Sequence, residues 1–399
     1  MKNYKSLFYT GAVILLLALS SCENMIDVDL PNNQIVANQV FEDVQTSNAA
    51  LAALYGSLRD NSILSGTSAG ALLGTYTDDL DAYTLTDING IYGLYNNQQS
   101  DTNTIVYSTW ANAYQNIYTA NAIIEGTHLS QSLSIAEKQR ISAEAIFVRA
   151  ILMYFLQRIY GDVPFPTSTD YNINRSLSKK PSKEILADLE KDFLYVSGIL
   201  TDNYRSAERI FPNKKTAQLM LAKIYMLEKK WNEAEAILKL VVRSPLYPFQ
   251  NDINKVFIKT EGHIIWQLKT QSATEATKEA TLYYFSNTAP SMYALANDLV
   301  NALDNTDLRK QLWMTKVVAN NRSFYRPNKY KNIANNTTEY SIVFRVEEAY
   351  LLLAETLAQQ NKIDESLIYL NPTRERAGLI PLGAMSNENL LNEILAETR

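Results

Sequence analysis

Cysteine and histidine are nearly absent from this sequence of 399 residues, which contains one cysteine and two histidines. A single cysteine excludes an internal disulfide, so packing must stabilise the fold. His128 and His263 are far apart and have no metal-ligand spacing around them, which indicates an ordinary surface or loop position for each. Zinc patterns, phosphate-binding Gly-Lys loops and nucleophile-elbow motifs are missing too. We therefore expect a protein without catalytic activity or a cofactor.

Long apolar runs and basic clusters are scarce as well. After the first 22 residues, no segment approaches the length of a transmembrane span, so we expect the body of the protein outside the bilayer. The net charge is −5, and basic pairs such as Lys179-Lys180 are typical of solvated helix ends. The charge pattern therefore predicts no binding of nucleic acid.

Residues 1–21 have the layout of a bacterial lipoprotein signal. Lys2 and Lys5 give a positive start, an apolar run covers residues 7–19, and small residues lead to Cys22. We expect cleavage before Cys22, a diacylglycerol on its thiol, and residues 22–40 as a tether to the membrane. Two or more acyl chains would hold the folded body there stably. The alternative is an ordinary signal peptide with a chance cysteine nearby.

The rest of the chain, 41–399, is predicted to be mainly helical, with an all-α fold class. Helical patterns cover about 41–60, 108–245 and 341–399, whereas about 61–107 and 246–340 are loop-rich. The individual helices are expected at 40–59, with a cap at Thr46-Ser47-Asn48, and at 108–125, 136–160 and 181–200. Gly161 is expected to end the third of these helices. A strand is expected at 262–268.

An internal repeat predicts two helix hairpins. Residues 219–222 (Leu-Met-Leu-Ala) match 351–354 (Leu-Leu-Leu-Ala), and 232–234 (Asn-Glu-Ala) match 364–366 (Asp-Glu-Ser) at the same offset. The small residues Ala222/Ala234 and Ala354/Ser366 would let paired helices approach closely. This is the tetratricopeptide pattern, in which hairpins bury their faces by stacking on neighbours. Two unrelated amphipathic hairpins are the alternative.

Tyrosine is unusually frequent, with 25 copies against 12 of phenylalanine. Its ring suits both half-buried helix seams and surfaces that stack on sugars. Several tyrosines fall in the aperiodic segment 61–107 beside carboxylates and amides, and a loop of that length is usually functional or disordered. A glycan site needs such rings with hydrogen-bonding groups around them. The candidate ligand-binding residues are Tyr76, Asp78, Asp79, Tyr83, Tyr92, Tyr95, Asn96 and Tyr284. Simple packing under the loop is the alternative for each tyrosine.

Asp78, Asp79 and Asp81 allow two further interpretations. A glycosidase needs an acid opposite a base at a set separation, and nothing in the sequence supplies that context. A calcium loop would need its glycine and terminal glutamate, which are missing. We expect no hydrolysis, and leave a structural calcium ion open.

Five segments in a fixed order carry a resemblance to a known family. They are the lipobox at Cys22, the segments 110–124, 143–164 and 217–242, and the block 344–379 with Arg374-Glu375-Arg376-Ala377-Gly378-Leu379. Together they resemble the SusD/RagB family of nutrient-binding outer-membrane lipoproteins of the Bacteroidetes. The resemblance implies a tetratricopeptide scaffold, an irregular lobe with the ligand site, and a role as lid on a SusC-like TonB-dependent transporter barrel.

The expected function is therefore non-enzymatic binding of an oligosaccharide at the outer face of the outer membrane, for delivery to the transporter. A surface interaction scaffold without a small ligand and a binder of another nutrient such as peptide are the alternatives. The long loop with Tyr, Asn and Asp favours a ligand-binding protein, because a pure scaffold has no need of it. Members of the family continue past the helix expected from Asn387, so we expect a truncated or diverged end at Arg399.

Overall fold

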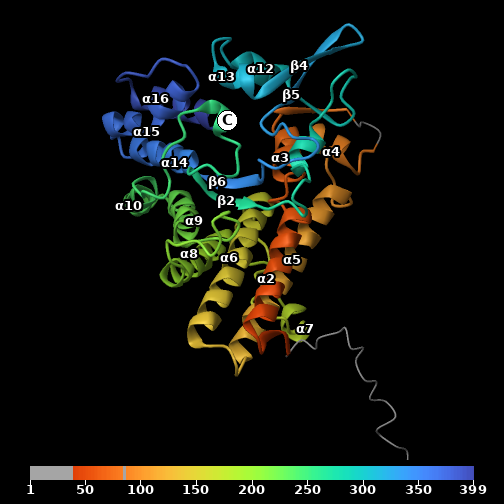
Figure 1. Ribbon diagram of the computed structural model, residues 1–399, viewed down its shortest axis with the longest axis vertical. Coiled ribbons are helices and arrows are strands. Elements are labelled where there is room, and N and C mark those ends of the chain that lie inside the picture. The colour runs from red at the N-terminus through yellow and green to blue at the C-terminus, as the bar shows by residue number, and fades with distance from the viewer. Residues whose placement is uncertain (1–38, 84–86) are drawn as a thin grey trace, which may run out of the picture.

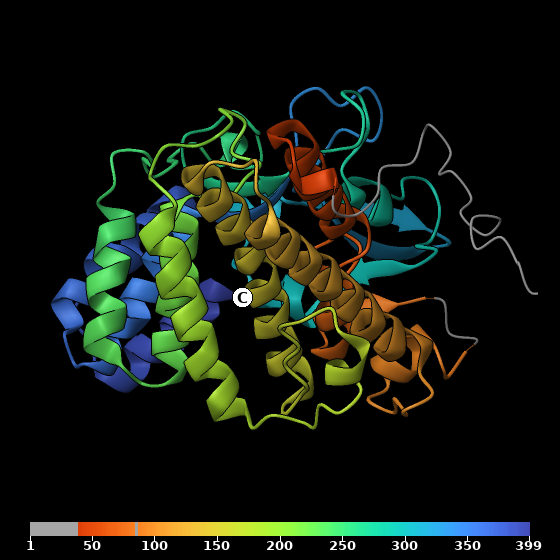
Figure 2. The same cartoon turned by 90° about the horizontal axis from the view of Figure 1, so that it is seen from below.

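The computed structural model describes residues 39–83 and 87–399, and Cys22 with its expected signal and tether lies outside them. The described chain is mainly helical, which confirms the predicted fold class. Long helices form a scaffold in which each packs on the next, as Figures 1 and 2 show from two sides. Its helices are α2 (Val44–Asp60), α5 (Thr104–Leu129), α6 (Ile135–Tyr160), α8 (Ser182–Ile199), α9 (Lys214–Leu227), α10 (Trp231–Val242), α14 (Val346–Gln359), α15 (Ile363–Arg376) and α16 (Asn387–Thr398).

Capping side chains decide where these helices begin. The cap of α2 is Asp43, whose carboxylate accepts from the backbone N–H of Gln45 at 2.9 Å and of Thr46 at 3.2 Å. The expected cap at Thr46-Ser47-Asn48 is wrong, because the hydroxyls of Thr46 and Ser47 donate to carbonyls of the preceding turn. Asn103 caps α5 in the same manner, so this helix begins before the expected residue 108. Gly161 ends α6 with φ of 78°, as predicted.

The two predicted hairpins are confirmed. They are α9–α10 and α14–α15, and α10 packs on α14. Ala222, Ala234, Ala354 and Ser366 have no exposed surface. The hydroxyl of Ser366 donates to the carbonyl oxygen of Ala354 at 2.7 Å, so this polar group is satisfied at the helix seam. The small residues therefore lie where the sequence repeat placed them.

The second lobe consists of short elements, and in Figure 1 it lies above α2, α5 and α6 and to the right of α14, α15 and α16. The segment 61–107 lacks long helices but contains ordered elements. The elements of the lobe are α3 (Ala69–Tyr76), β1 (Leu80–Ala82), α4 (Ile91–Tyr95), η3 (Ile253–Lys255), α11 (Lys278–Leu282), β3 (Tyr293–Leu295), α12 (Asn297–Ala302), α13 (Leu308–Leu312), β4 (Met314–Ala319) and β5 (Arg322–Pro327). Outside the lobe, η2 (Gln39–Phe41) packs on α2 and α5, and α7 (Tyr171–Asn174) lies between α6 and α8 in the chain. Strands β1 and β3 pair antiparallel, as do β4 and β5.

A third strand pair joins the lobe to the scaffold. Strands β2 (Ile264–Leu268) and β6 (Ser341–Arg345) are antiparallel, and β2 falls within the strand predicted at 262–268. Trp266 of β2 is fully buried, with its ring 5.4 Å from that of Phe147 in α6 and 6.0 Å from that of Phe344 in β6. The largest hydrophobic cluster therefore runs from the scaffold helices into this pair of strands.

Overpacking the seam of the first hairpin should destabilise the protein. Ala222→Leu adds three carbon atoms to a site with no free surface, so we expect a loss of about 1–3 kcal/mol in the free energy of unfolding. The matched control is Ala236→Leu, on the exposed face of α10 in the same hairpin. Urea denaturation of both variants measures the difference. If the two variants were equally stable, Ala222 would not lie at the contact between α9 and α10.

Candidate functional site

The predicted ligand residues fall into separate groups around the lobe. Asp81, Tyr83 and Tyr95 come together where β1 meets α4. The hydroxyl of Tyr95 donates to the carboxylate of Asp81 at 3.2 Å. Tyr83 packs edge-on against Phe324 of β5, with ring centroids 5.8 Å apart. Burial raises the pKa of all three groups, so the carboxyl lies in a partly desolvated corner beside two rings.

Tyr92 lies in α4, the helix that also carries Tyr95, and Asn96 is the residue that caps the C-terminal end of α4. The side-chain amide of Asn96 donates to the carbonyl oxygen of Tyr92 at 2.8 Å, and the ring of Tyr92 is half-buried. Gly93 between the two tyrosines is tightly packed, because a Cβ there would lie 2.2 Å from the carbonyl oxygen of Ile88. The turn that presents Tyr92 is therefore held by close packing.

Tyr76 and Tyr284 are the more exposed rings of the predicted set, at 42% and 40% of their surface. Tyr76 ends α3. Tyr284 lies in a loop after α11, and the guanidinium of Arg326 stands 4.8 Å from its ring centroid. That distance allows a cation–π contact, so one face of the Tyr284 ring is occupied.

The three neighbouring aspartates do not converge on one point. Asp79 accepts from Nε and Nη2 of Arg399, at 2.8 and 2.6 Å, and so faces the C-terminal helix. Asp81 faces Tyr95, and Asp78 has φ of 62° in the turn between α3 and β1. Within residues 39–83 and 87–399, no group of three or more His, Cys, Asp or Glu is arranged to hold a metal ion. The calcium ion stays a prediction.

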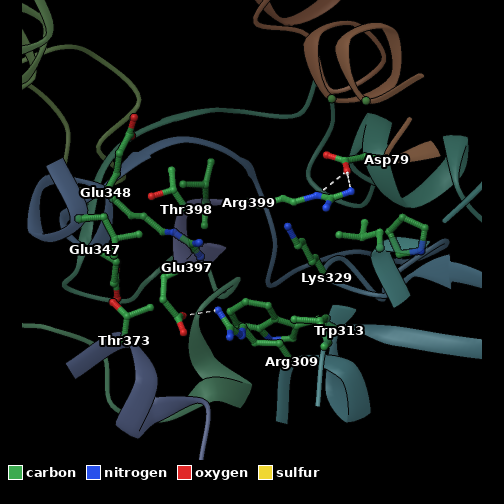
Figure 3. A pocket seen from close by; sticks show the side chains of 18 of the residues that line it. Asp79, Arg309, Trp313, Lys329, Glu347, Glu348, Thr373, Glu397, Thr398 and Arg399 are labelled. Atoms are coloured by element: carbon green, nitrogen blue, oxygen red, sulfur yellow. Dashed lines mark hydrogen bonds and ion pairs between the residues drawn. The ribbon is translucent and has the colours of Figure 1, made fainter. Parts of the chain in front are cut away.

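The structure adds a cavity that the sequence did not reveal. It has a volume of about 1370 Å³ and lies between α3, α12, α14, α16 and the segment 327–330. Arg399 lines this cavity, and in Figure 1 the C-terminus lies between α16 and the short elements of the lobe; Figure 3 shows charged side chains along the cavity walls. Arg309 bridges Asp307 and Glu397 at 2.7 and 2.8 Å, and Glu397 also accepts from Arg374 at 2.8 Å. Arg374 belongs to the block that carries the family resemblance, but nothing in the sequence indicated that it would meet Arg309 and Glu397, which come from distant segments.

His128 is exposed as expected, and His263 lies in the turn before β2, a loop position as predicted, but it is buried rather than at the surface. His263 is 1% exposed, and its Nδ1 lies 2.8 Å from the carboxylate of Glu347. The other oxygen of that carboxylate accepts from Arg376 at 2.8 Å. Burial acts to raise the pKa of Glu347, but the hydrogen bond and charge of His263, with the charges of Arg345 and Arg376, lower it to about 2. Sequence spacing could not reveal this contact, because its members are far apart in the chain.

No helix in the part of the chain that the structure describes combines the length and apolar character needed to cross a membrane.

Comparison with known proteins gives a consistent set of relatives. A family model described as "SusD-like_3: Starch-binding associating with outer membrane" matches residues 28–226, and the "SusD_RagB: SusD family" model matches 249–399. SusD-like protein P2 of Formosa agariphila is 28% identical over 100% of this chain and 86% of its own length. SusD-like protein P25 of the same organism is 23% identical over 92% and 80%.

Solved structures share the fold at lower identity. Surface glycan-binding protein A from Bacteroides uniformis matches with a TM-score of 0.76 at 18% identity, covering 89% of this chain and 85% of its own. A SusD superfamily protein from Bacteroides thetaiotaomicron matches with a TM-score of 0.74 at 21% identity, covering 89% and 85%. The helical scaffold with its irregular lobe is thus an architecture found in other proteins.

Replacing the carboxylate of Glu347 should destabilise the fold in a pH-dependent manner. Because folding lowers its pKa from 4.5 to about 2, the carboxylate contributes stability above about pH 4.5, and that contribution is lost as the pH falls toward 2. Glu347→Gln leaves Arg376 buried without a counter-ion, so we expect a loss of roughly 3–5 kcal/mol at pH 7. The difference from wild type should shrink below pH 4.5.

Urea denaturation at pH 7 and at steps between pH 5 and 3 measures this difference. Glu365→Gln is the control, because Glu365 is half exposed and its contact with Lys239 is 3.4 Å long, so its loss should be small. A difference that does not change with pH would exclude the ionised carboxylate as the cause.

Proposed function

Because this chain belongs to the SusD family, a family of surface glycan- and nutrient-binding proteins, we propose that it binds an oligosaccharide outside the cell. It would pass that ligand to a TonB-dependent outer-membrane transporter of SusC type, over which it acts as a lid. Its family model is described as associating with the outer membrane, which supports this location. The proposed attachment is the lipid on Cys22, facing the cell exterior.

The observation that carries the proposed ligand class is the corner at β1 and α4. Tyr83 and Tyr95 flank Asp81, and the hydroxyl of Tyr95 already donates to that carboxylate. Tyr92 and Asn96 extend this corner toward solvent. Sugars present C–H faces that pack on aromatic rings and hydroxyls that need paired acceptors and donors. We therefore propose this corner as part of the glycan-binding surface.

We propose binding rather than conversion of the ligand. A glycosidase requires two carboxyl groups that face the same bond, one as acid and one as base or nucleophile. Asp79 is paired with Arg399 and Asp81 with the Tyr95 hydroxyl, so the two carboxylates turn to different partners. A solved protein of the same fold is described as a surface glycan-binding protein, which agrees with a binding role.

Loss of the Tyr92 ring should weaken glycan binding without destabilising the fold. A glycan array of the mature chain identifies a bound glycan, and titration calorimetry then measures its affinity for Tyr92→Ala. Aromatic contacts contribute about 0.5–1.5 kcal/mol beyond area burial, so we expect binding to weaken several-fold at a nearly unchanged melting temperature. Tyr95 is less suitable for this test, because it also packs against the cluster around Ala71 and Ala82.

Tyr283→Ala is the control for a packing ring, since Tyr283 lies 6.2 Å from the ring of Tyr293. It should lower the melting temperature. Unchanged affinity in Tyr92→Ala would move the glycan surface elsewhere in the lobe, and the absence of any bound glycan would argue against the proposed ligand class.

The proposed anchor depends on one thiol. Cys22→Ser removes the only cysteine, so this variant should lose lipid attachment and leave the outer-membrane fraction after a high-salt wash. Asn33→Ser, a change in the tether that keeps the thiol, should remain in that fraction. Quantitative recovery of Cys22→Ser with the outer membrane would contradict lipid anchoring.

A further inference from the structure

Nearly every cation on the cavity wall has a carboxylate partner. The pairs are Lys223 with Glu348, Arg309 with Asp307 and Glu397, Arg374 with Glu393 and Glu397, Arg376 with Glu347, and Arg399 with Asp79. Lys329 and Arg345 also line the cavity, and within residues 39–83 and 87–399 neither forms an ion pair. The cavity therefore contains positive charge that the described protein does not neutralise.

Lys329 projects into the cavity beside Arg399 and above Trp313, as Figure 3 shows. Its Nζ lies 5.9 Å from the centroid of the Trp313 ring. Lys329 is exposed where it lines the cavity, but the protein around it partly desolvates the ammonium group and lowers its pKa to about 8, and the positive charges of Arg345 and Arg309 act in the same direction. Lys329 is therefore still mainly protonated at pH 7, and no carboxylate among residues 39–83 and 87–399 pairs with it.

Arg345, the last residue of β6, also approaches the ring of Trp313. Its guanidinium carbon lies 5.9 Å from the Trp313 ring and 5.5 Å from the Phe257 ring. Its Nη1 is buried and has no hydrogen-bond acceptor in the part of the chain that the structure describes. The nearby carboxylate of Glu347 is already bound by Arg376 and His263. A buried guanidinium donor without an acceptor is costly, so an external acceptor would stabilise it.

Aromatic rings connect the two cations. Phe257 packs edge-on against both Trp313 and Tyr330, with centroid distances of 5.2 Å in each case. The hydroxyl of Tyr330 accepts from the backbone N–H of Ile342 at 2.9 Å, which leaves its own proton for donation. Near Lys329 and Arg345 the wall thus combines aromatic rings with hydrogen-bond donors.

Two carboxyl groups on the wall also have no cation partner, but they do not neutralise this region. Asp304 accepts from the backbone and hydroxyl of Thr306 at an exposed turn. Burial raises the pKa of Glu279, which favours its neutral form. The charges that act on Lys329 are both positive. An anion would therefore be attracted to Lys329 and Arg345 despite the acidic net charge of the chain.

We propose that Lys329 and Arg345 form a subsite for an oxyanion, carboxylate or sulfate, on an acidic saccharide whose ring packs against the half-buried rings of Phe257 and Tyr330 in the cavity wall. This assignment rests on the proposed glycan-binding function and narrows its ligand class. A volume of about 1370 Å³ is larger than the 300–1,000 Å³ of most small-ligand pockets, so several sugar units fit. Guanidinium and ammonium groups provide strong, charge-assisted hydrogen bonds to oxyanions.

The test compares Lys329→Met with wild type by titration calorimetry. The probes are tetragalacturonate, κ-carrageenan tetrasaccharide, neutral galactotetraose and tetraglutamate. The wild type should bind one of the two acidic saccharides and discriminate against the neutral one. Loss of a charge-assisted hydrogen bond should weaken that binding tenfold or more in Lys329→Met, and Lys329→Arg should retain most of it. Lys316→Met, an exposed lysine of β4 without an ion pair among the described residues, is the matched control and should bind as wild type does.

A melting curve separates a binding residue from a structural one. Lys329 is exposed and has no ion-pair partner among the described residues, so Lys329→Met should leave the melting temperature nearly unchanged, whereas loss of a packing residue lowers stability and affinity together. Binding of neither acidic saccharide, or equal affinity of wild type and Lys329→Met, would overturn the subsite. Binding of tetraglutamate alone would assign the cavity to an acidic peptide instead. Any neutral glycan found by the array would still support the proposed function in these cases.

Discussion

The carboxylate of Glu347 is the contact on which the junction between scaffold and lobe depends. It lies in the first turn of α14, where the helix dipole favours a negative charge, and it binds His263 before β2 and Arg376 at the end of α15. The backbone N–H of Val346 also donates to the carbonyl oxygen of His263 at 2.9 Å. One buried anion thus fixes the first strand of the β2–β6 pair and the second hairpin relative to each other. Because each partner is buried, none can be removed without leaving an unpaired group.

This junction also determines what lines the cavity. Because α14 begins directly after β6, Arg345 at the end of the strand lies close enough to Glu347 for its charge to act on that carboxylate, whose oxygens bind Arg376 and His263. The segment that follows β5 places Lys329 near the ring of Trp313, which Arg345 also approaches. Two cations are consequently held together by backbone geometry rather than by mutual attraction, since like charges repel. Such an arrangement is stable only if the rest of the fold imposes it or a ligand compensates it.

The tyrosines show how one residue type serves two purposes in the lobe. Tyr283 packs on Tyr293 and helps to bury the small cluster around Ala71 and Ala82, so its ring contributes to the lobe's own core. Tyr76 keeps 42% of its surface exposed, and Tyr92 lies at a turn beside Asn96. Without long helices, the lobe relies on rings to cover its short strands, and the remaining rings are available at the surface.

The sequence by itself determined the helical scaffold, because its information is local. The spacing of apolar residues predicted the helices, and Gly161 predicted the end of α6. The repeated small residues Ala222 and Ala354 predicted where the helices of each hairpin touch. The sequence located the start of α2 less well, because Asp43 and the nearby Thr46, Ser47 and Asn48 are all residue types that can cap a helix. Only the tertiary structure decided the environment of His263 and the assembly of the cavity. Ion pairs and cavities join side chains from distant segments, and no periodicity in the chain records which charges will meet or which, like that of Lys329, will be left unpaired.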